Sequence, residues 1–207
     1  MKSDRRKPKP ERGSSQARVQ SPESTAPRQP GTNQDPSAAA GTVVVIVALG
    51  SNCGDSPALI RAAMDRLEAL SAAPLRRSSL WRSAPVDCPP GSPWFVNAAV
   101  ALAPRPGETP ESLLDKLQAL ERAFGRRPKQ VLNEPRPLDL DLIAFGAERR
   151  ASPRLSLPHP RAATRRFVLA PVAEIAPDLR PPGWPAPAAA LLGQLPPGEV
   201  VERLGPA

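Results

Sequence analysis

The stretch NEPRPLDLDLIAFG, residues 133–146, places two aspartates inside an apolar run that has the length of a β-strand. Side chains alternate between the two faces of a strand, so Asp139 and Asp141 point to one face and the leucines around them point to the other. Their Cα atoms lie about 6.5 Å apart in such a strand. Two carboxylates that close repel each other unless a cation accompanies them. The pattern therefore predicts a strand with one apolar core face and one carboxylate face that needs a cationic partner.

The composition is that of one globular domain with a tail. The chain has 207 residues, 40% of them hydrophobic, and a formal net charge of +8. Half of this charge comes from residues 1–40, which are rich in Pro, Ser, Arg and Gln and contain no aromatic residue. We expect residues 1–40 to be a disordered basic tail, because such a segment buries too little apolar surface to offset its ordering entropy. The tail is either a solvated extension or an electrostatic contact for a polyanion.

The sequence also bears on membranes, thiols and metals. No apolar run reaches the roughly 18 residues that a membrane span needs, and the N-terminus has no apolar signal-peptide core. The two cysteines, Cys53 and Cys88, are too few for a disulfide framework, and a single histidine argues against structural zinc. We expect a cytoplasmic protein with free thiols and no membrane association, and we leave a transit peptide open as an alternative reading of the tail.

Apolar periodicity predicts four strands and two helices in the order βαββαβ. The strands are expected at 42–50, 75–81, 94–103 and 138–145, and the helices at 55–70 and 109–124. Asp55 and Thr109 are of the N-cap type, and a proline follows each of them within the first helical turn. The order is typical of an α+β fold, a ferredoxin-like βαββαβ sandwich with two helices on one face of the sheet.

The remainder of the chain is expected to cover part of the other face of the sheet. Residues 167–175 and 188–192 have helical patterns. We therefore divide the chain into the tail, a domain at 41–180, and a Pro/Gly-rich C-terminal extension at 181–207 that packs on the domain or trails it.

Several residue groups point to phosphate chemistry. The chain has no P-loop, no Rossmann glycine motif and no nucleophile elbow. It does have the paired aspartates and a basic loop before them, with Arg126, Arg127, Lys129 and Arg136. This combination suits a magnesium nucleotide, because carboxylates bind Mg²⁺ and guanidinium groups neutralise phosphate. Taken singly, each feature also has an ordinary interpretation: edge-strand charges, a basic surface, a loop histidine, or core phenylalanines.

Five segments together resemble the 6-hydroxymethyl-7,8-dihydropterin pyrophosphokinase family of folate biosynthesis. They occur in order and at suitable spacings between about residues 43 and 180. They are ALGSNCGD (48–55), SSLWRSAPV (78–86), FVNAAV (95–100), ERAFGRR with PRPLDLDLIAFG (121–146), and LPHPRAATRRFVLAPVAEIAPDL (157–179). The departures are mainly in the loop, where Arg127-Pro128 and Asn133-Glu134 replace residues that many relatives carry.

The resemblance implies transfer of pyrophosphate from ATP to the pterin hydroxymethyl group, with release of AMP. It implies that Asp139 and Asp141 bind two Mg²⁺ ions and act by electrostatic stabilisation and templating; a general-base role is less favoured, because a metal-bound carboxylate is a weak base. Arg126 and Arg136 match catalytic arginines that close over the phosphates.

The resemblance also implies two sets of substrate contacts. The implied ATP contacts are Gln118, Glu121, Leu142, Arg154, Ser156, His159 and Arg165. The implied pterin contacts are backbone groups of Ser83, Ala84 and Val86, the amide of Asn97, and the rings of Phe95 and Phe167, which would sandwich the bicycle.

Two rival interpretations stay open at this stage. A ferredoxin-like domain with a basic tail is also typical of RNA-binding modules, although no RNP-like aromatic pattern occurs on the expected strands. A catalytically inactive relative that serves as a binding partner is the second rival. We expect a monomer that binds ATP and the pterin, and we do not expect it to bind nucleic acid.

Overall fold

The structure is a computed structural model that describes residues 43–127 and 134–207. The expected tail, 1–40, and the middle of the basic loop, 128–133, lie outside the described residues, so what was predicted for them stays a prediction.

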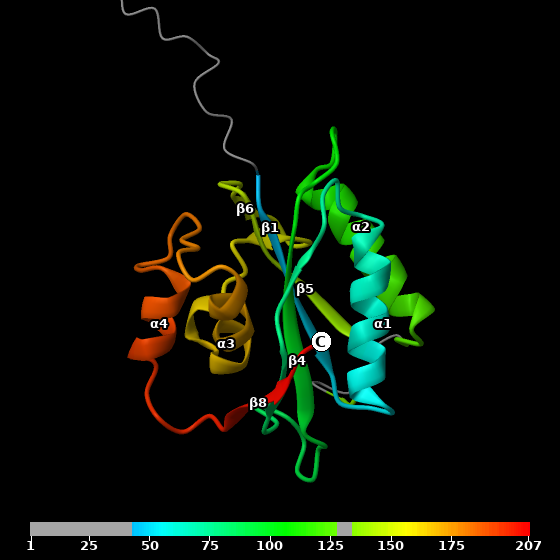
Figure 1. The fold of residues 1–207 in the computed structure, drawn as a ribbon, viewed down its shortest axis with the longest axis vertical. Coiled ribbons are helices and arrows are strands. Elements are labelled where there is room, and N and C mark those ends of the chain that lie inside the picture. Colours follow the sequence, from blue (N-terminus) through cyan, green and yellow to red (C-terminus); the bar gives the residue numbers. More distant parts are fainter. Residues whose placement is uncertain (1–42, 128–133) are drawn as a thin grey trace, which may run out of the picture. The chain divides into compact units, whose positions relative to one another are not determined.

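An antiparallel sheet of six strands lies between two layers of helices (Figure 1). The strand order is β5-β1-β4-β3-β8, with β2 also paired to β4. The strands are β1 (Val45–Ser51), β2 (Arg76–Arg77), β3 (Leu80–Ser83), β4 (Phe95–Leu102), β5 (Asp139–Phe145) and β8 (Val201–Gly205). Two further short strands, β6 (Arg150–Ala151) and β7 (Ser156–Leu157), form a separate hairpin. The fold is α+β, as predicted.

Helices cover both faces of the sheet. Figure 1 shows α1 (Ser56–Glu68) and α2 (Pro110–Ala123) on one face, and α3 (Arg166–Ile175) with α4 (Ala188–Gln194) on the other. A 3₁₀ turn, η1 (Ala162–Thr164), precedes α3. The predicted N-caps are confirmed: the Asp55 side chain accepts from the Ala58 N–H, and the Thr109 side chain accepts from the Ser112 N–H.

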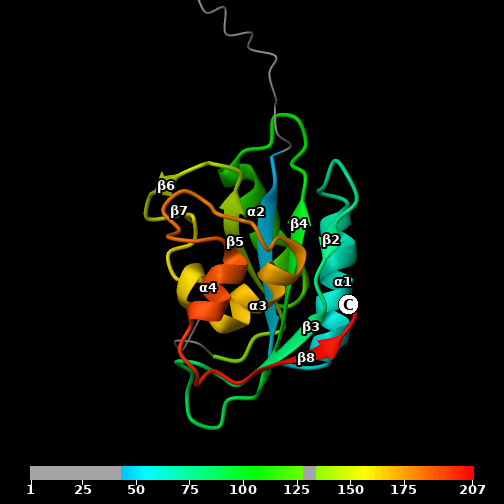
Figure 2. The ribbon, with the colours of Figure 1, turned by 60° about the vertical axis from the view of Figure 1, so that its left-hand side comes forward.

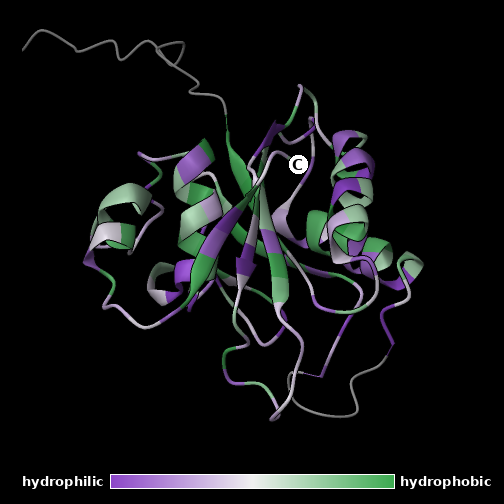
Figure 3. Cartoon of the chain, turned by 60° about the horizontal axis from the view of Figure 1, so that its bottom comes forward, coloured by the Kyte–Doolittle hydropathy of each residue, from purple (hydrophilic) through white to green (hydrophobic). Residues whose placement is uncertain are grey.

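The alternation of β1 divides the hydrophobic core in two. Val45, Val47 and Leu49 pack with α1 and α2, whereas Ile46 and Ala48 belong to the cluster that contains α3 and α4. Figure 3 shows hydrophobic residues along the strands between the helical layers. The leucines that flank the aspartates of β5 all belong to the α1/α2 core, as predicted: Leu138, Leu140 and Leu142. Asp139 and Asp141 therefore face the α3 side.

Two features differ from the sequence-based expectations. The strand expected at 75–81 is divided into β2 and β3, because the Ser78 hydroxyl accepts the Ala99 N–H at 2.8 Å and replaces a regular ladder bond. The second difference is β8, which lies in the C-terminal extension and pairs with β3 at the edge of the sheet. In the pairing of β8 with β3, Val201 lies opposite Ser83.

Both cysteines, Cys53 and Cys88, are free thiols, as predicted. Within the described residues, no helix combines the length and the apolar character that crossing a membrane would require.

Candidate active site

A cavity of about 190 Å³ opens on the α3 side of the sheet. Its walls come from β1, β3, β4, β5 and the start of α3, together with the loop after β3. All six predicted pterin residues and all four predicted catalytic residues line it, although they come from distant parts of the chain. These are Ser83, Ala84, Val86, Phe95, Asn97, Phe167, Arg126, Arg136, Asp139 and Asp141.

A glycine and a buried amide lie side by side on the sheet face of the cavity. Asn97 is 5% exposed, and its Nδ2 donates to Ser83 Oγ at 2.9 Å. Gly50 is paired with both Asn97 and Asp139 across the ladder. A Cβ at Gly50 would lie 3.7 Å from Asn97 Oδ1 and 3.8 Å from the Asp139 Cβ. The missing side chain therefore leaves room for a flat ligand between the amide and the carboxylate.

Two arginines bind the first carboxylate of the pair. Arg126 Nη1 donates to Asp139 Oδ1 at 2.7 Å, and Arg136 Nη1 lies 3.1 Å from Asp139 Oδ2. The Arg136 backbone is itself fixed, since its N–H donates to Asn52 Oδ1 at 2.9 Å. The predicted basic loop is thus joined to Asp139 through the two predicted catalytic arginines.

The environment of the second carboxylate, Asp141, favours either its protonation or a cation beside it. Burial, with the nearby charge of Asp139, raises the pKa of Asp141 to about 6. A bound divalent cation would offset the same electrostatic cost.

The carboxylate oxygens of Asp139 and Asp141 are of the kind that bind Mg²⁺ in proteins. Across residues 43–127 and 134–207, no group of three or more His, Cys, Asp or Glu side chains could hold a metal ion. A cation at the aspartates would take its remaining oxygens from water and from phosphate, as Mg²⁺ commonly does in nucleotide enzymes.

Glu121 supports the carboxylate strand from α2. It is 6% exposed, and its Oε1 accepts the Leu140 N–H at 2.7 Å, between the two aspartates. The same oxygen pairs with Arg126. Burial raises the pKa of Glu121 against the opposing effects of these two partners. Glu121 thus fixes the backbone of β5 at the carboxylates, a contact that the sequence did not predict.

A second, larger cavity of about 860 Å³ lies beside α2. Gln118 and Glu121, two of the predicted ATP residues, line it. Four residues line both cavities, namely Arg126, Arg136, Asp139 and Asp141. The carboxylates and arginines therefore stand where the two cavities meet, which suits a reaction between two bound substrates.

The other predicted ATP residues are distributed unevenly. Arg165 lines the first cavity. Leu142, Arg154, Ser156 and His159 are not among the described residues that line either cavity. Leu142 belongs to the α1/α2 core, and the His159 N–H donates to the Ile143 carbonyl at 2.9 Å. Burial lowers the pKa of His159, so the neutral imidazole is favoured.

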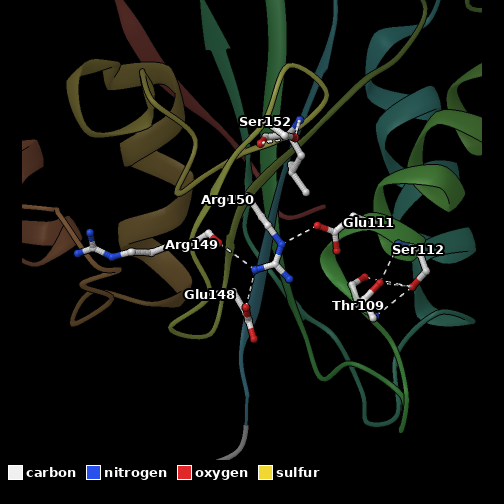
Figure 4. Close-up of polar contacts among 8 residues, drawn as sticks. Thr109, Glu111, Ser112, Glu148, Arg149, Arg150 and Ser152 are labelled. Atoms are coloured by element: carbon white, nitrogen blue, oxygen red, sulfur yellow. Dashed lines mark hydrogen bonds and ion pairs between the residues drawn. The ribbon is translucent and has the colours of Figure 1, made fainter.

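Arg154 and Ser156 belong to the β6–β7 hairpin, which ion pairs hold against α2. Arg150 Nε lies 2.5 Å from Glu111 Oε1 in the first turn of α2, and its Nη1 lies 2.7 Å from Glu148 Oε2 (Figure 4). Arg154 pairs with Asp115 farther along α2. The hairpin therefore has a fixed position beside the helix that carries Gln118 and Glu121.

Sequence reasoning missed several residues of the first cavity. Ala48 and Gly50 line it from β1, and alternation along that strand could have placed them on the carboxylate face. Arg161 also lines it, two residues after the only histidine. With Arg126, Arg136 and Arg165, it brings the arginines of the cavity to four.

Comparison with known proteins shows the family of the chain. The chain matches the family model described as 7,8-dihydro-6-hydroxymethylpterin-pyrophosphokinase (HPPK) over residues 46–177. A 2-amino-4-hydroxy-6-hydroxymethyldihydropteridine pyrophosphokinase of Pseudomonas aeruginosa is 43% identical over 139 residues, which are 67% of this chain and 83% of that protein. A protein of the same name from Porphyromonas gingivalis is 36% identical over 141 residues, 67% of this chain and 94% of that protein.

Solved structures share the fold. Wild-type HPPK-DHPS of Plasmodium falciparum aligns with a TM-score of 0.56 at 13% identity, over 74% of this chain and 41% of that chain. This chain therefore spans less than half of the solved chain, and at this identity the likeness shows the fold alone.

The family description and the names of these relatives define the class of protein, a transferase of the kinase type. The match to the family model covers more than half of the chain, and the chain belongs to the HPPK family.

Proposed function

We propose that the chain transfers pyrophosphate from ATP to 6-hydroxymethyl-7,8-dihydropterin, with AMP as the second product, at the junction of the two cavities. Family membership supports the reaction, which is a step of folate synthesis. The observation that carries the assignment to this site is the junction itself. Asp139, Asp141, Arg126 and Arg136 line both cavities, so a group that passes from one cavity to the other passes these side chains.

The smaller cavity is the proposed pterin site. A flat heterocycle with polar edges needs stacking faces and an amide that both donates and accepts. Phe95 and Phe167 supply the rings. Asn97 supplies the amide, beside Gly50, where the absence of a side chain leaves space for the ligand on the sheet face of the cavity. The Asn97 Oδ1 can accept from the pterin, and Nδ2, which uses one of its two hydrogens for Ser83 Oγ, keeps the other to donate. The Ala84 N–H donates to the Val200 carbonyl at 3.2 Å, which leaves the Ala84 carbonyl for the ligand.

The larger cavity is the proposed ATP site. Gln118 and Glu121 line it, and the arginines at its junction with the pterin cavity neutralise phosphate oxygens. Asp139 and Asp141 would hold two Mg²⁺ ions, which would offset the charge that develops on the transferred group. For Arg154 to contact ATP, it would leave Asp115.

Catalysis at this junction rests on positioning and charge. The hydroxymethyl oxygen of the pterin attacks the β-phosphorus of ATP, and AMP leaves from the opposite side. Arg126 and Arg136 both pair with Asp139 in this structure, and a cation bound at that carboxylate would leave their guanidinium groups available for phosphate oxygens. No side chain needs to form a covalent bond with the substrate.

Several finer predictions belong with this proposal. We infer that β1, β3, β4 and β5, with α1 and α2, form the ferredoxin-like βαββαβ unit, supported by the order β5-β1-β4-β3 and its antiparallel pairing. The monomeric state, the cytoplasmic location and the absence of nucleic-acid binding stay predictions.

The decisive experiment measures AMP release from Mg-ATP with and without the pterin. We expect pterin-dependent AMP from the wild type and none from the double variant Asp139→Asn/Asp141→Asn. Asp178→Asn, an exposed aspartate after α3, is the matched control and should retain full activity. If folded wild type releases no AMP, the chain is an inactive relative. If it instead binds RNA at physiological salt without need of Asp139, the RNA-binding reading is correct.

A further inference from the structure

The C-terminal extension lies beyond the residues that match the family model, and it contacts the walls of the proposed pterin cavity. The match ends at residue 177, whereas the segment that leads from the end of α4 to the first residue of β8 covers residues 195–201. Figure 2 shows this segment running from α4 to β8 and ending beside β3. On this course it meets two walls of the cavity, the end of β3 and the start of α3.

Two consecutive residues bind one wall each. The Val200 carbonyl accepts the Ala84 N–H at 3.2 Å, at the point where β3 gives way to the loop that lines the pterin cavity. Glu199 Oε2 accepts the Arg166 N–H at 2.9 Å, at the first residue of α3. Arg166 lies between Arg165 and Phe167, which both line the cavity.

The carboxylate of Glu199 accepts a hydrogen bond from a backbone N–H that has no acceptor within α3. The N-cap residue of α3, Arg165, makes no side-chain capping bond. The first N–H groups of a helix have no intrahelical partner and need an external acceptor, and a negative charge there also favours the helix dipole. Glu199 thus acts as a cap supplied from the C-terminal segment.

Further bonds fix the segment on both sides. Arg166 Nη2 donates to the carbonyls of Leu195 at 2.9 Å and Pro196 at 3.2 Å. On the other wall, Val201 pairs with Ser83, whose hydroxyl accepts from Asn97 Nδ2 at 2.9 Å. The contacts of the segment therefore lead within one or two residues to the amide and to a ring of the proposed pterin site.

We propose that residues 195–201 set the spacing between the two walls of the pterin cavity, with Glu199 as a positioning residue for Phe167. This inference rests on the proposed function for the identity of the ligand. It adds that the affinity for the pterin depends on a segment outside the family match. None of residues 195–201 is among the described residues that line either cavity, so we expect the segment to affect pterin binding and not the chemical step.

The test compares Glu199→Ala, Glu199→Gln and Glu202→Ala by calorimetric titration with the pterin and by steady-state kinetics. Glu202 is the matched control, because it lies in β8, one residue beyond the segment, and its carboxylate pairs with Arg82 on β3 at 2.6 Å. We expect Glu199→Ala to raise the pterin Kd by about 2- to 30-fold, the range that corresponds to a lost helix cap. Its kcat at saturating pterin should stay within about threefold of wild type, because the junction is unchanged.

The conservative variant separates positioning from simple loss of stability. Glu199→Gln keeps an oxygen acceptor for the Arg166 N–H, so it should restore most of the pterin affinity. Amide hydrogen exchange at Arg166 and Phe167 should quicken in Glu199→Ala and not in Glu202→Ala.

The outcomes distinguish the two proposals. Pterin binding without AMP release would refute the proposed function while the titrations still decide the role of Glu199. An unchanged pterin Kd in Glu199→Ala, an equal rise in Glu202→Ala, or a wild type that binds no pterin would overturn the positioning role.

Discussion

Replacing Gly50 with alanine should weaken pterin binding while leaving the fold as stable as before or more so. The added Cβ would lie 3.7 Å from Asn97 Oδ1 and 3.8 Å from the Asp139 Cβ, distances of ordinary van der Waals contact. The strand itself therefore accepts the methyl group without strain. A glycine within a strand costs roughly 0.5–1 kcal/mol relative to alanine, so the free energy of unfolding should rise by up to this amount.

The effect on the ligand has the opposite sign. The methyl group would stand on the floor of a cavity of about 190 Å³, between the amide and the carboxylate. Overfilling a packed site costs typically about 1–3 kcal/mol, which corresponds to about a 5- to 150-fold rise in the pterin Kd. The KM for ATP should change little, because Gly50 does not line the larger cavity among the described residues.

Thermal melts and calorimetric titrations with the pterin measure the two effects separately. Gly193→Ala is the matched control: Gly193 lies in α4, and an added Cβ would meet nothing within 4 Å. It should raise stability in the same direction without a change in pterin affinity. If Gly50→Ala binds the pterin within twofold of wild type, the ring does not lie over Gly50 and the proposed floor is wrong.

Three further predictions follow from contacts and from the sequence. Arg136→Ala should lower kcat more than it raises the pterin KM, since its charge serves the phosphates; a collapse of pterin affinity with kcat intact would contradict the assignment. Removal of residues 1–40 should leave kcat unchanged, which a truncated chain tests directly, because nothing in those residues matches the site. Glu174→Gln should lower the free energy of unfolding near pH 7, and its difference from wild type should shrink as the pH falls below 4.5. Denaturant unfolding at pH 7 and at a pH below 4.5 measures this difference.

The sign of the last prediction follows from the environment of Glu174. Burial raises its pKa, but hydrogen bonds from Ser79 and Trp81, together with the one from Arg203, outweigh burial and lower the pKa from 4.5. A lowered pKa in the folded state contributes stability above the unfolded value, and this contribution is lost as the pH falls through the folded value. A difference that grows in acid would contradict the lowered pKa.

Strand alternation explains why much of the site could be predicted. Because Asp139 and Asp141 are two residues apart, their common face followed from the period of a strand alone. Their partners required more than local pattern. The basic character of Arg126 is visible in the sequence, but its bond to Asp139 depends on how α2 packs against β5.

The elements that were missed depend on tertiary pairing. The sequence VERLG of β8 has no run of apolar alternation, and its residues form a strand because the edge of β3 offers backbone partners. The break at Ser78 has a similar cause, since its hydroxyl replaces a ladder bond that only β4 can supply. Neither feature leaves a periodic signal that could be read from one chain.

The division of the core by β1 has a practical consequence for engineering. Side chains such as Leu67 and Leu117 lie in the α1/α2 core, on the face opposite the carboxylates. Their truncation should cost about 2–5 kcal/mol and reduce the amount of folded protein without changing its substrate preference. Thermostabilising changes can therefore be sought among the residues of this core that line neither cavity, such as Leu67 and Leu117, with little risk to turnover. Changes that retune pterin specificity have to be sought on the α3 face, where side chains such as Phe167 and Val168 both pack in the fold and line the smaller cavity.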